Sequence, residues 1–392
     1  MNDEEVALIV ISDLEFGGAQ RQVVELANHL AGVGIESQVC TLADYTPLAA
    51  SLRHPERLHL VRRRGRYDLT VVPRLAALIR RVGAALVHGF LFDAEVASRV
   101  AGRLAGVPVI GSERNANYVV RRKNALAYRL TRPCVDLVIA NSSAGADFHS
   151  RRFGVPRSSC RVVYNGVDTG RFRPCDGGTA RDGLGLGRED QVVGMFASFK
   201  EQKDHPLLLL AARELLQSRP RLRLLLVGDE LFAGGSDSRP WKQRIEGMVD
   251  TLGLRRHCVL AGNRDDVERL YPACDLTVLP SRFEGIPNVV LESMACGVPV
   301  VVTDVSDNAR IVPDGRVGFV VPAGDRAALV ARIQLLLDAP TRRREMAAEA
   351  RRWAAAEFSV ERLAERTAQI YREAIERRRR RRPAPRRRAA HG

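Results

Sequence analysis

Short apolar runs alternate with amphipathic segments along nearly the whole chain, and this alternation limits the possible folds more than any other feature. The apolar runs predict buried strands at 6–11, 39–42, 58–61, 85–88, 107–111 and 137–140, and again at 192–196, 222–227, 258–261, 276–279 and 300–303. Amphipathic segments such as 21–31 and 94–104 lie between them. Continuous apolar strands that alternate with helices are typical of parallel sheets covered on both faces. Two such sets predict an α/β fold with two Rossmann-like, doubly wound domains facing across a crevice.

Domain boundaries follow from local composition. Residues 173–185 are rich in Gly, Asp and Pro, which is typical of a linker or surface loop. We therefore predict an N-terminal domain at 1–170 and a C-terminal domain at 171–355. Apolar residues at helical spacing then predict a helix at 356–376, and residues 377–392 form a polyarginine tail. In doubly wound domains, ligands bind at the carboxyl ends of the strands.

Composition excludes several classes of protein. With 45% hydrophobic and 27% charged residues, the chain is typical of a globular protein. It contains no apolar run of about 18 residues, and its acidic N-terminus differs from a secretory signal. The seven cysteines are scattered and form no CxxC motif, so we expect reduced thiols. These features favour a cytoplasmic protein.

Positive charge is concentrated in the first half of the chain and in its C-terminal tail. Residues 1–170 hold 22 basic and 16 acidic residues, residues 171–376 hold 30 of each, and residues 377–392 hold nine Arg and no acid. We expect the tail to be disordered, because its charges repel and Pro383 and Pro385 block a helix. It could bind an anionic membrane surface, bind nucleic acid, or remain solvated. Nucleic acid is the least favoured partner, because no aromatic residues are interleaved with the arginines.

Two loops that follow predicted strands are candidates for binding phosphate. In SDLEFGGAQ (12–20), Gly17 and Gly18 would let the backbone approach a ligand at the start of the next helix, although a tight turn explains them equally well. In FASFKEQKDH (196–205), Lys200 and Lys203 could face a phosphate, although a solvated surface loop explains them too.

Paired glutamates mark a third candidate segment, SRFEGIPNVVLESMACGVPVVVTD (281–304). Glu284 lies in a loop, and a helix is predicted from Asn288 onward with Glu292 just after its first turn. Glu292 could accept hydrogen bonds from a sugar diol, and the helix start could bind phosphate. A carboxylate near a helix start also stabilises the helix dipole without any ligand.

The block from Glu284 to Glu292, followed by MACGVPV, resembles the E-x7-E donor motif of retaining GT-B glycosyltransferases of the family 4 type. The segments IANSSAGADF (139–148), YNGVDTGRF (164–172), LLLVGDE (224–230) and VLAGNRDDV (259–267) resemble other parts of that family. The resemblance implies that residues 1–170 bind the acceptor and residues 171–355 bind a nucleotide-sugar donor. It also implies that the helix at 356–376 crosses back to the N-terminal domain.

The resemblance implies a role for each matching residue. Glu284 would contact the donor sugar near the reacting centre, and Glu292 would hold the ribose hydroxyls. Lys203 would bind the diphosphate. The diphosphate would also meet the backbone N–H groups of Asn288, Val289 and Val290. The resemblance further implies that the Gly17–Gly18 loop approaches the phosphates, that the backbone at Arg264 faces the nucleobase, and that no cofactor or metal is needed; the sequence contains no D-x-D.

Several positions depart from the family pattern. Ser198 stands where the family usually has Arg, and Lys200 is a candidate for the missing charge. Arg114 stands where the family often has His; a guanidinium could stabilise the leaving phosphate or bind an anionic acceptor, but it cannot act as a base. His88 is the other candidate catalytic residue, although a histidine at a strand end is more often structural.

A last departure is the run TDVSDNARIV, where family members often have glycines and this chain has Ser306 and Asp307. We expect this difference to alter how the acceptor or the donor is seated.

The expected function is transfer of a hexose-type sugar from a UDP- or GDP-sugar to an acceptor hydroxyl, with retention. The resemblance and the basic N-terminal half favour bacterial surface polysaccharide or glycolipid assembly, with a lipid-linked acceptor at the inner face of the cell membrane. The alternatives are a nucleotide-sugar epimerase or another GT-B enzyme, and a non-catalytic scaffold with a degenerate site.

Overall fold

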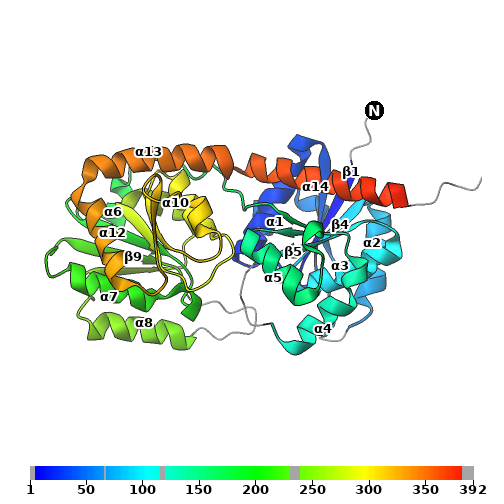
Figure 1. Ribbon diagram of the computed structural model, residues 1–392, viewed down its shortest axis with the longest axis horizontal. Helices are drawn as coiled ribbons and strands as arrows, with labels where there is room; N and C mark the ends of the chain where they lie inside the picture. Colours follow the sequence, from blue (N-terminus) through cyan, green and yellow to red (C-terminus); the bar gives the residue numbers. More distant parts are fainter. Residues whose placement is uncertain (1–4, 66–67, 115–119, 230–238, 382–392) are drawn as a thin grey trace, which may run out of the picture.

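The computed structural model describes residues 5–65, 68–114, 120–229 and 239–381. Figure 1 shows two domains side by side, each built around a sheet with helices on both faces. Every strand pair in the two sheets is parallel. These features confirm the predicted α/β fold of two Rossmann-like domains.

The N-terminal sheet has seven strands in the order β3-β2-β1-β4-β5-β6-β7. The strands are β1 (Glu5–Ile11), β2 (Ile35–Thr41), β3 (Leu58–Leu60), β4 (Leu86–Phe90), β5 (Val109–Glu113), β6 (Leu137–Ala140) and β7 (Cys160–Val162). The helices are α1 (Gly18–His29), α2 (Val71–Arg81), α3 (Phe92–Ala105), α4 (Arg122–Leu130) and α5 (Ser143–Phe153). Strand β1 is buried on both faces: Ile9 packs with α1, whereas Leu8 packs with α2 and α3.

The C-terminal sheet has six strands in the order β10-β9-β8-β11-β12-β13. The strands are β8 (Gln191–Phe196), β9 (Leu222–Val227), β10 (Cys258–Gly262), β11 (Leu276–Leu279), β12 (Val300–Thr303) and β13 (Gly318–Val321). The helices are α6 (Gly178–Gly183), α7 (His205–Leu215), α8 (Arg239–Thr251), α9 (Val267–Leu270), α10 (Asn288–Ala295), α11 (Asn308–Ile311), α12 (Arg326–Asp338) and α13 (Pro340–Glu357). One apolar core contains α10 and α13, and the other contains α7, α8 and α12.

The chain returns to the N-terminal domain through a final helix, α14 (Val360–Arg381). At the crossing, the N–H of Val167 donates to the carbonyl of Phe358 at 2.7 Å, and the N–H of Val360 donates to the carbonyl of Val167 at 3.2 Å. Tyr371 of α14 is fully buried in the same core as α1. Figure 1 shows α13 and α14 running along one side of both domains. None of the described helices is both long and apolar enough to span a bilayer.

The expected disorder of residues 377–381 is wrong, because α14 continues through Arg381. Acidic residues one turn earlier offset the repulsion between the arginines. Arg377 forms an ion pair with Glu373 at 2.6 Å, and Arg380 forms one with Glu376 at 2.7 Å. Such i,i+4 pairs support a helix. The rest of the predicted tail, 382–392, lies outside the described residues.

Candidate functional site

Loops from both domains meet where the strands of the two sheets end. Gly17 and Gly18 follow β1, and α10 of the other domain begins opposite them. The Asn288 side chain donates through Nδ2 to the carbonyl of Gly18 at 3.3 Å. A Cβ on Gly18 would lie 3.5 Å from that nitrogen, which is an ordinary contact. The glycine loop and the start of α10 therefore form the two sides of one site.

Glu284 lies at the centre of a hydrogen-bonded cluster after β11. Its Oε1 accepts from Lys203 Nζ at 2.5 Å and from Ser281 Oγ at 2.6 Å, and its Oε2 accepts from Gln202 Nε2 at 3.3 Å. Glu284 is 5% exposed. Lys203 belongs to a short 3-10 helix, η6 (Glu201–Lys203), that follows β8. The structure thus brings together a carboxylate and an ammonium that lie 81 residues apart in the sequence.

Lys200 brings a second cation close to Lys203. Burial lowers the pKa of Lys200, and the charge of Lys203 lowers it further, whereas Glu15 in the glycine loop opposes the shift. Lys200 and Lys203 therefore lie in one loop after β8, and the charge of Glu15 in the other domain acts on Lys200. Ser198 lies half-buried in the same loop.

Glu292 projects from α10 and is 6% exposed. Its Oε2 accepts from the Tyr271 hydroxyl at 2.7 Å, and its Oε1 lies 3.7 Å from the Arg21 guanidinium of α1. The Tyr271 ring stacks on Phe196, with ring centroids 3.9 Å apart. This arrangement fixes the carboxylate and leaves Oε1 facing the other domain. Tyr271 could not be predicted as a partner of Glu292, because it follows α9 and has no local link to the motif.

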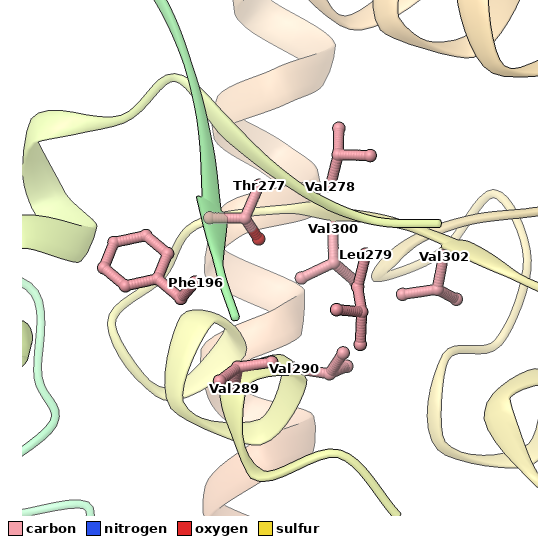
Figure 2. Close-up of a pocket in the computed structure, with 8 residues that line it drawn as sticks. All are labelled: Phe196, Thr277, Val278, Leu279, Val289, Val290, Val300 and Val302. Atoms are coloured by element: carbon pink, nitrogen blue, oxygen red, sulfur yellow. The ribbon is translucent and has the colours of Figure 1, made fainter. Parts of the chain in front are cut away.

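Apolar packing holds α10 against the sheet. Figure 2 shows a small pocket between α10 and strands β8, β11 and β12, with Val289 and Val290 on its helix side. Its remaining lining residues are Phe196, Thr277, Val278, Leu279, Val300 and Val302. The pocket is lined by no titratable side chain, so we assign it no part in catalysis. Its lining residues pack α10 against the sheet.

The helix start offers fewer free N–H groups than the resemblance implies. The N–H of Val290 donates to the carbonyl of Pro287 at 3.2 Å, so it is already used, and Val290 is 1% exposed. The role of Val290 as a backbone donor to phosphate stays a prediction, and its N–H would have to leave or share this contact to fulfil it. Asn288 and Val289 precede Val290 in the first turn of the helix, where N–H groups have no partner within the helix.

Arg264 follows β10, and its guanidinium makes two hydrogen bonds to its neighbour Asp266, at 2.8 and 2.6 Å. Its side chain is thus engaged locally, which leaves its backbone as the part that could face a ligand. Among the described residues, no group of three or more His, Cys, Asp or Glu side chains is placed to hold a metal ion. Metal independence stays a prediction.

His88 is completely buried, and both ring nitrogens have partners. Nδ1 lies 2.7 Å from the Tyr371 hydroxyl, and Nε2 lies 2.8 Å from Ser112 Oγ. Burial, and then the charge of Arg114, lower the pKa of His88 well below its ordinary value. His88 therefore joins α14 to the sheet, and both of its ring nitrogens are engaged there. A catalytic role for it stays a prediction.

Arg114 points toward the interdomain linker. Its Nη1 donates to Asn165 Oδ1 at 3.3 Å, and its guanidinium carbon lies 4.5 Å from the centre of the Phe90 ring. Burial lowers the pKa of Arg114 to about 10. The structure places Arg114 at the domain junction, where it contacts Asn165; a catalytic role for it stays a prediction.

Asp307 is an interdomain contact that the sequence did not predict. Its carboxylate accepts from the backbone N–H of Ser143 at 2.7 Å and of Ala144 at 3.1 Å, at the start of α5. The Tyr164 hydroxyl also donates to it, at 3.1 Å. A carboxylate at a helix N-terminus is stabilised by the helix dipole. Asp307 therefore helps to hold the two domains together.

Two family models match almost the whole chain. "Glycosyltransferase Family 4" matches residues 16–171, and "Glycosyl transferases group 1" matches residues 178–353. A D-inositol 3-phosphate glycosyltransferase of Segniliparus rotundus is 33% identical over 54% of this chain and 46% of its own length. D-inositol 3-phosphate glycosyltransferase 2 of Catenulispora acidiphila is 29% identical over 92% of this chain and 91% of its own length. The chain spans about half the length of the first curated relatives that it matches.

The fold is shared with solved structures over nearly the full length. Anabaena HepE, solved in complex with UDP and glucose, has a TM-score of 0.83 and is 23% identical, covering 94% of this chain and 100% of its own. The two parallel sheets, the site between the domains and the two family models all indicate the same family. The chain therefore belongs to the glycosyltransferases of the family 4 type, with the GT-B fold.

Proposed function

We propose that this protein transfers a hexose-type sugar from a UDP- or GDP-sugar to an acceptor hydroxyl, with retention of configuration. The observation that carries the proposal is the pairing of Glu284 with Lys203 beside the start of α10. A carboxylate suits the hydroxyls of a sugar, whereas an ammonium and free N–H groups suit a diphosphate. Both kinds of group converge on the point where the two domains meet.

The proposed reaction breaks the bond between the anomeric carbon and the diphosphate oxygen, which keeps the electron pair. Lys203 and Lys200 stabilise the negative charge that develops on the leaving diphosphate. The ammonium of Lys203 has three donors, so it can bind a phosphate oxygen while it keeps Glu284 as a partner. The acceptor oxygen forms the new bond from the leaving-group face, and its proton passes to the departing phosphate.

The other site residues fit the binding of the nucleotide. Glu292 Oε1 lies 3.7 Å from Arg21 of the other domain, and ribose hydroxyls would donate to it there. The structure of HepE is described as a complex with UDP and glucose, and that similarity supports a UDP-sugar. The names of the relatives support an acceptor that bears several hydroxyls.

The face of α4 supports an acceptor embedded in an anionic membrane. Leu126 and Leu130 are 56% and 71% exposed and lie one turn apart. Arg122, Lys123 and Arg129 are exposed around them, and α4 contains no acidic residue. Basic side chains around exposed leucines suit the surface of an anionic bilayer, which attracts each charge by about 1 kcal/mol. We accordingly place the protein at the cytoplasmic face of the membrane, in polysaccharide or glycolipid assembly.

The donor is tested by thermal unfolding with UDP-glucose, GDP-mannose, UDP and GDP, in buffer with EDTA. Binding to the native state raises the Tm by mass action. A rise in Tm with the compounds of one base identifies the nucleotide of the donor. Turnover is then measured as release of sugar from that donor. If the donor is converted to another nucleotide sugar without loss of the sugar, the protein is an epimerase. If no compound raises the Tm of the folded protein, the result favours the scaffold alternative.

The membrane proposal is tested by sedimentation with vesicles that contain anionic phospholipid. Leu126→Ser with Leu130→Ser should weaken binding at least tenfold, because two exposed apolar side chains are lost. Leu104, on α3, is 57% exposed, so Leu104→Ser is a matched control. Equal binding by the double variant and the control would contradict a membrane role for α4.

A further inference from the structure

Asn165 lies just after β7, in the segment that reaches the junction of the domains and is called the linker below, and it is 5% exposed. Its side-chain amide uses both of its polar atoms. The Nδ2 group donates to the carbonyl of Ile286 at 3.0 Å and to Asn288 Oδ1 at 2.7 Å, and Oδ1 accepts from Arg114 at 3.3 Å. Asn165 therefore joins the N-terminal domain to the loop and the helix that carry the donor motif.

The chain of contacts continues across the site. Asn288 accepts from Asn165 through Oδ1, which turns its Nδ2 toward the carbonyl of Gly18 at 3.3 Å. When a hydrogen bond fixes the oxygen of a side-chain amide, the direction in which its NH₂ group points is fixed as well. The orientation of Asn165 thus determines which atom of Asn288 faces the glycine loop.

We propose that Asn165 is a positioning residue that couples Arg114 to the start of α10 and so sets the separation between α10 and the glycine loop. This inference rests on the proposed function, because both sides of that gap are assigned to the donor diphosphate. Two donors and one acceptor are needed at this point. Among neutral side chains of this length, only Asn supplies both donors and an acceptor, and Asp would place an oxygen against two other oxygens.

Arg114 gains a role from this arrangement. Its Nε is buried without a hydrogen-bond partner among the described residues, so its contacts through Nη1 and over Phe90 matter more to its placement. A buried charge is strongly destabilised when a partner is removed. Arg114 holds Asn165, and Asn165 in turn holds Asn288.

Gln22, which contacts the residue next to Asn165, offers a matched control. Gln22 of α1, also buried, donates through Nε2 to the carbonyl of Gly166 at 2.8 Å and accepts from the N–H of Gly166 at 2.8 Å. It therefore holds the same linker with two hydrogen bonds but makes none to α10 among the described contacts. A variant of Gln22 loosens the linker without reorienting Asn288.

The test compares Asn165→Ala, Asn165→Asp and Gln22→Ala with the wild type. The readouts are the Kd for UDP or GDP, whichever raises the wild-type Tm, the turnover of donor hydrolysis, and the Tm without nucleotide. Both Asn165 variants should raise the Kd at least tenfold. Asn165→Asp keeps the partner of Arg114 and so serves if Asn165→Ala fails to fold. Gln22→Ala should lower the Tm but change the Kd less than threefold.

Coupling is tested by adding Asn288→Ala. If Asn165 acts through Asn288, the double variant Asn165→Ala, Asn288→Ala has the Kd of Asn288→Ala alone. If the fold-increases in Kd of the two single variants multiply in the double variant, the inference is overturned. It is also overturned if Gln22→Ala raises the Kd as much as Asn165→Ala does. A wild type that binds neither nucleotide would overturn the proposed function and this inference with it, whereas nucleotide binding with independent variants overturns the inference alone.

Discussion

Replacing Glu284 by Gln should separate nucleotide binding from sugar transfer. The glutamine side chain has nearly the same shape and keeps one oxygen for Lys203 and Ser281, which now contact Oε1 at 2.5 and 2.6 Å. It removes the negative charge that lies against Lys203. In the proposed mechanism, that charge contacts the donor sugar and repels the diphosphate. Its loss should therefore slow sugar transfer and strengthen nucleotide binding.

The size of the effect follows from the geometry. Glu284 Oε1 lies 2.5 Å from Lys203 Nζ. A phosphate oxygen bonded to the same ammonium would lie about 5 Å from that carboxylate oxygen. Two like charges at that distance repel by about 1 kcal/mol in water and about 3 kcal/mol at an effective dielectric constant of 20. Glu284→Gln should therefore tighten UDP binding by about five- to a hundredfold.

The assay is calorimetric titration of UDP, or of GDP if that nucleotide raises the Tm, together with the rate of sugar release from the matching donor. We expect a lower Kd and a rate lower by about a hundredfold or more. Glu201→Gln is the control, because Glu201 lies in the same 3-10 helix but is exposed and pairs with Arg282 at 3.4 Å. Weaker UDP binding by Glu284→Gln than by the wild type would refute the placement of the diphosphate on Lys203.

Three further predictions concern the nucleotide, the pH and the tail. Glu292→Ala should raise the donor KM by about tenfold or more, because charge-assisted hydrogen bonds to the ribose are lost; an unchanged KM would remove that role. Burial lowers the pKa of His149 to about 4 and that of His205 to about 3, and it also lowers the pKa of His88. The unfolded chain therefore binds protons below about pH 6.5 that the native state does not, and stability should fall by roughly 4 kcal/mol per pH unit for the three together. Urea unfolding at pH 7.5 and 5.5 measures this change, and equal stability at both values would contradict it. Deletion of residues 377–392 should release the protein from anionic vesicles and leave donor hydrolysis intact; undiminished sedimentation would rule out a role for the tail.

The sequence predicted the parts of the structure that depend on local pattern. Eleven of the strands were predicted from short apolar runs, and the central ones, such as β8 and β12, are buried on both faces as that pattern implies. The two that were missed, β7 and β13, are short strands at the ends of their sheets. Strand β7 carries Arg161, which forms an ion pair with Glu373 of α14, so its pattern is not that of a buried strand.

The surroundings of the site residues depend on partners that are distant in sequence or on detailed backbone geometry. The ring of His88 contacts Tyr371, which lies 283 residues later and which no local pattern connects with it. The hydrogen bond from the N–H of Val290 to Pro287 depends on the backbone geometry of the helix start. Tyr271 and Asn165 carry no motif of their own, and their roles arise from contacts with Glu292 and Asn288.

The departure at residues 306 and 307 acquires a physical meaning in the structure. Ser306 has φ = 54°, a conformation that glycine adopts without strain, so the turn keeps the backbone for which glycine is suited. Asp307, which follows it, supplies a carboxylate that glycine lacks, and this carboxylate accepts two N–H groups at the start of α5. Ser142 Oγ accepts the N–H of Gly145 at 2.9 Å, so three of the first N–H groups of α5 have partners. We expected this departure to change how a ligand is seated. The contacts connect it instead to the junction of the domains, so its effect on any ligand would act through the closure of the two domains over the site.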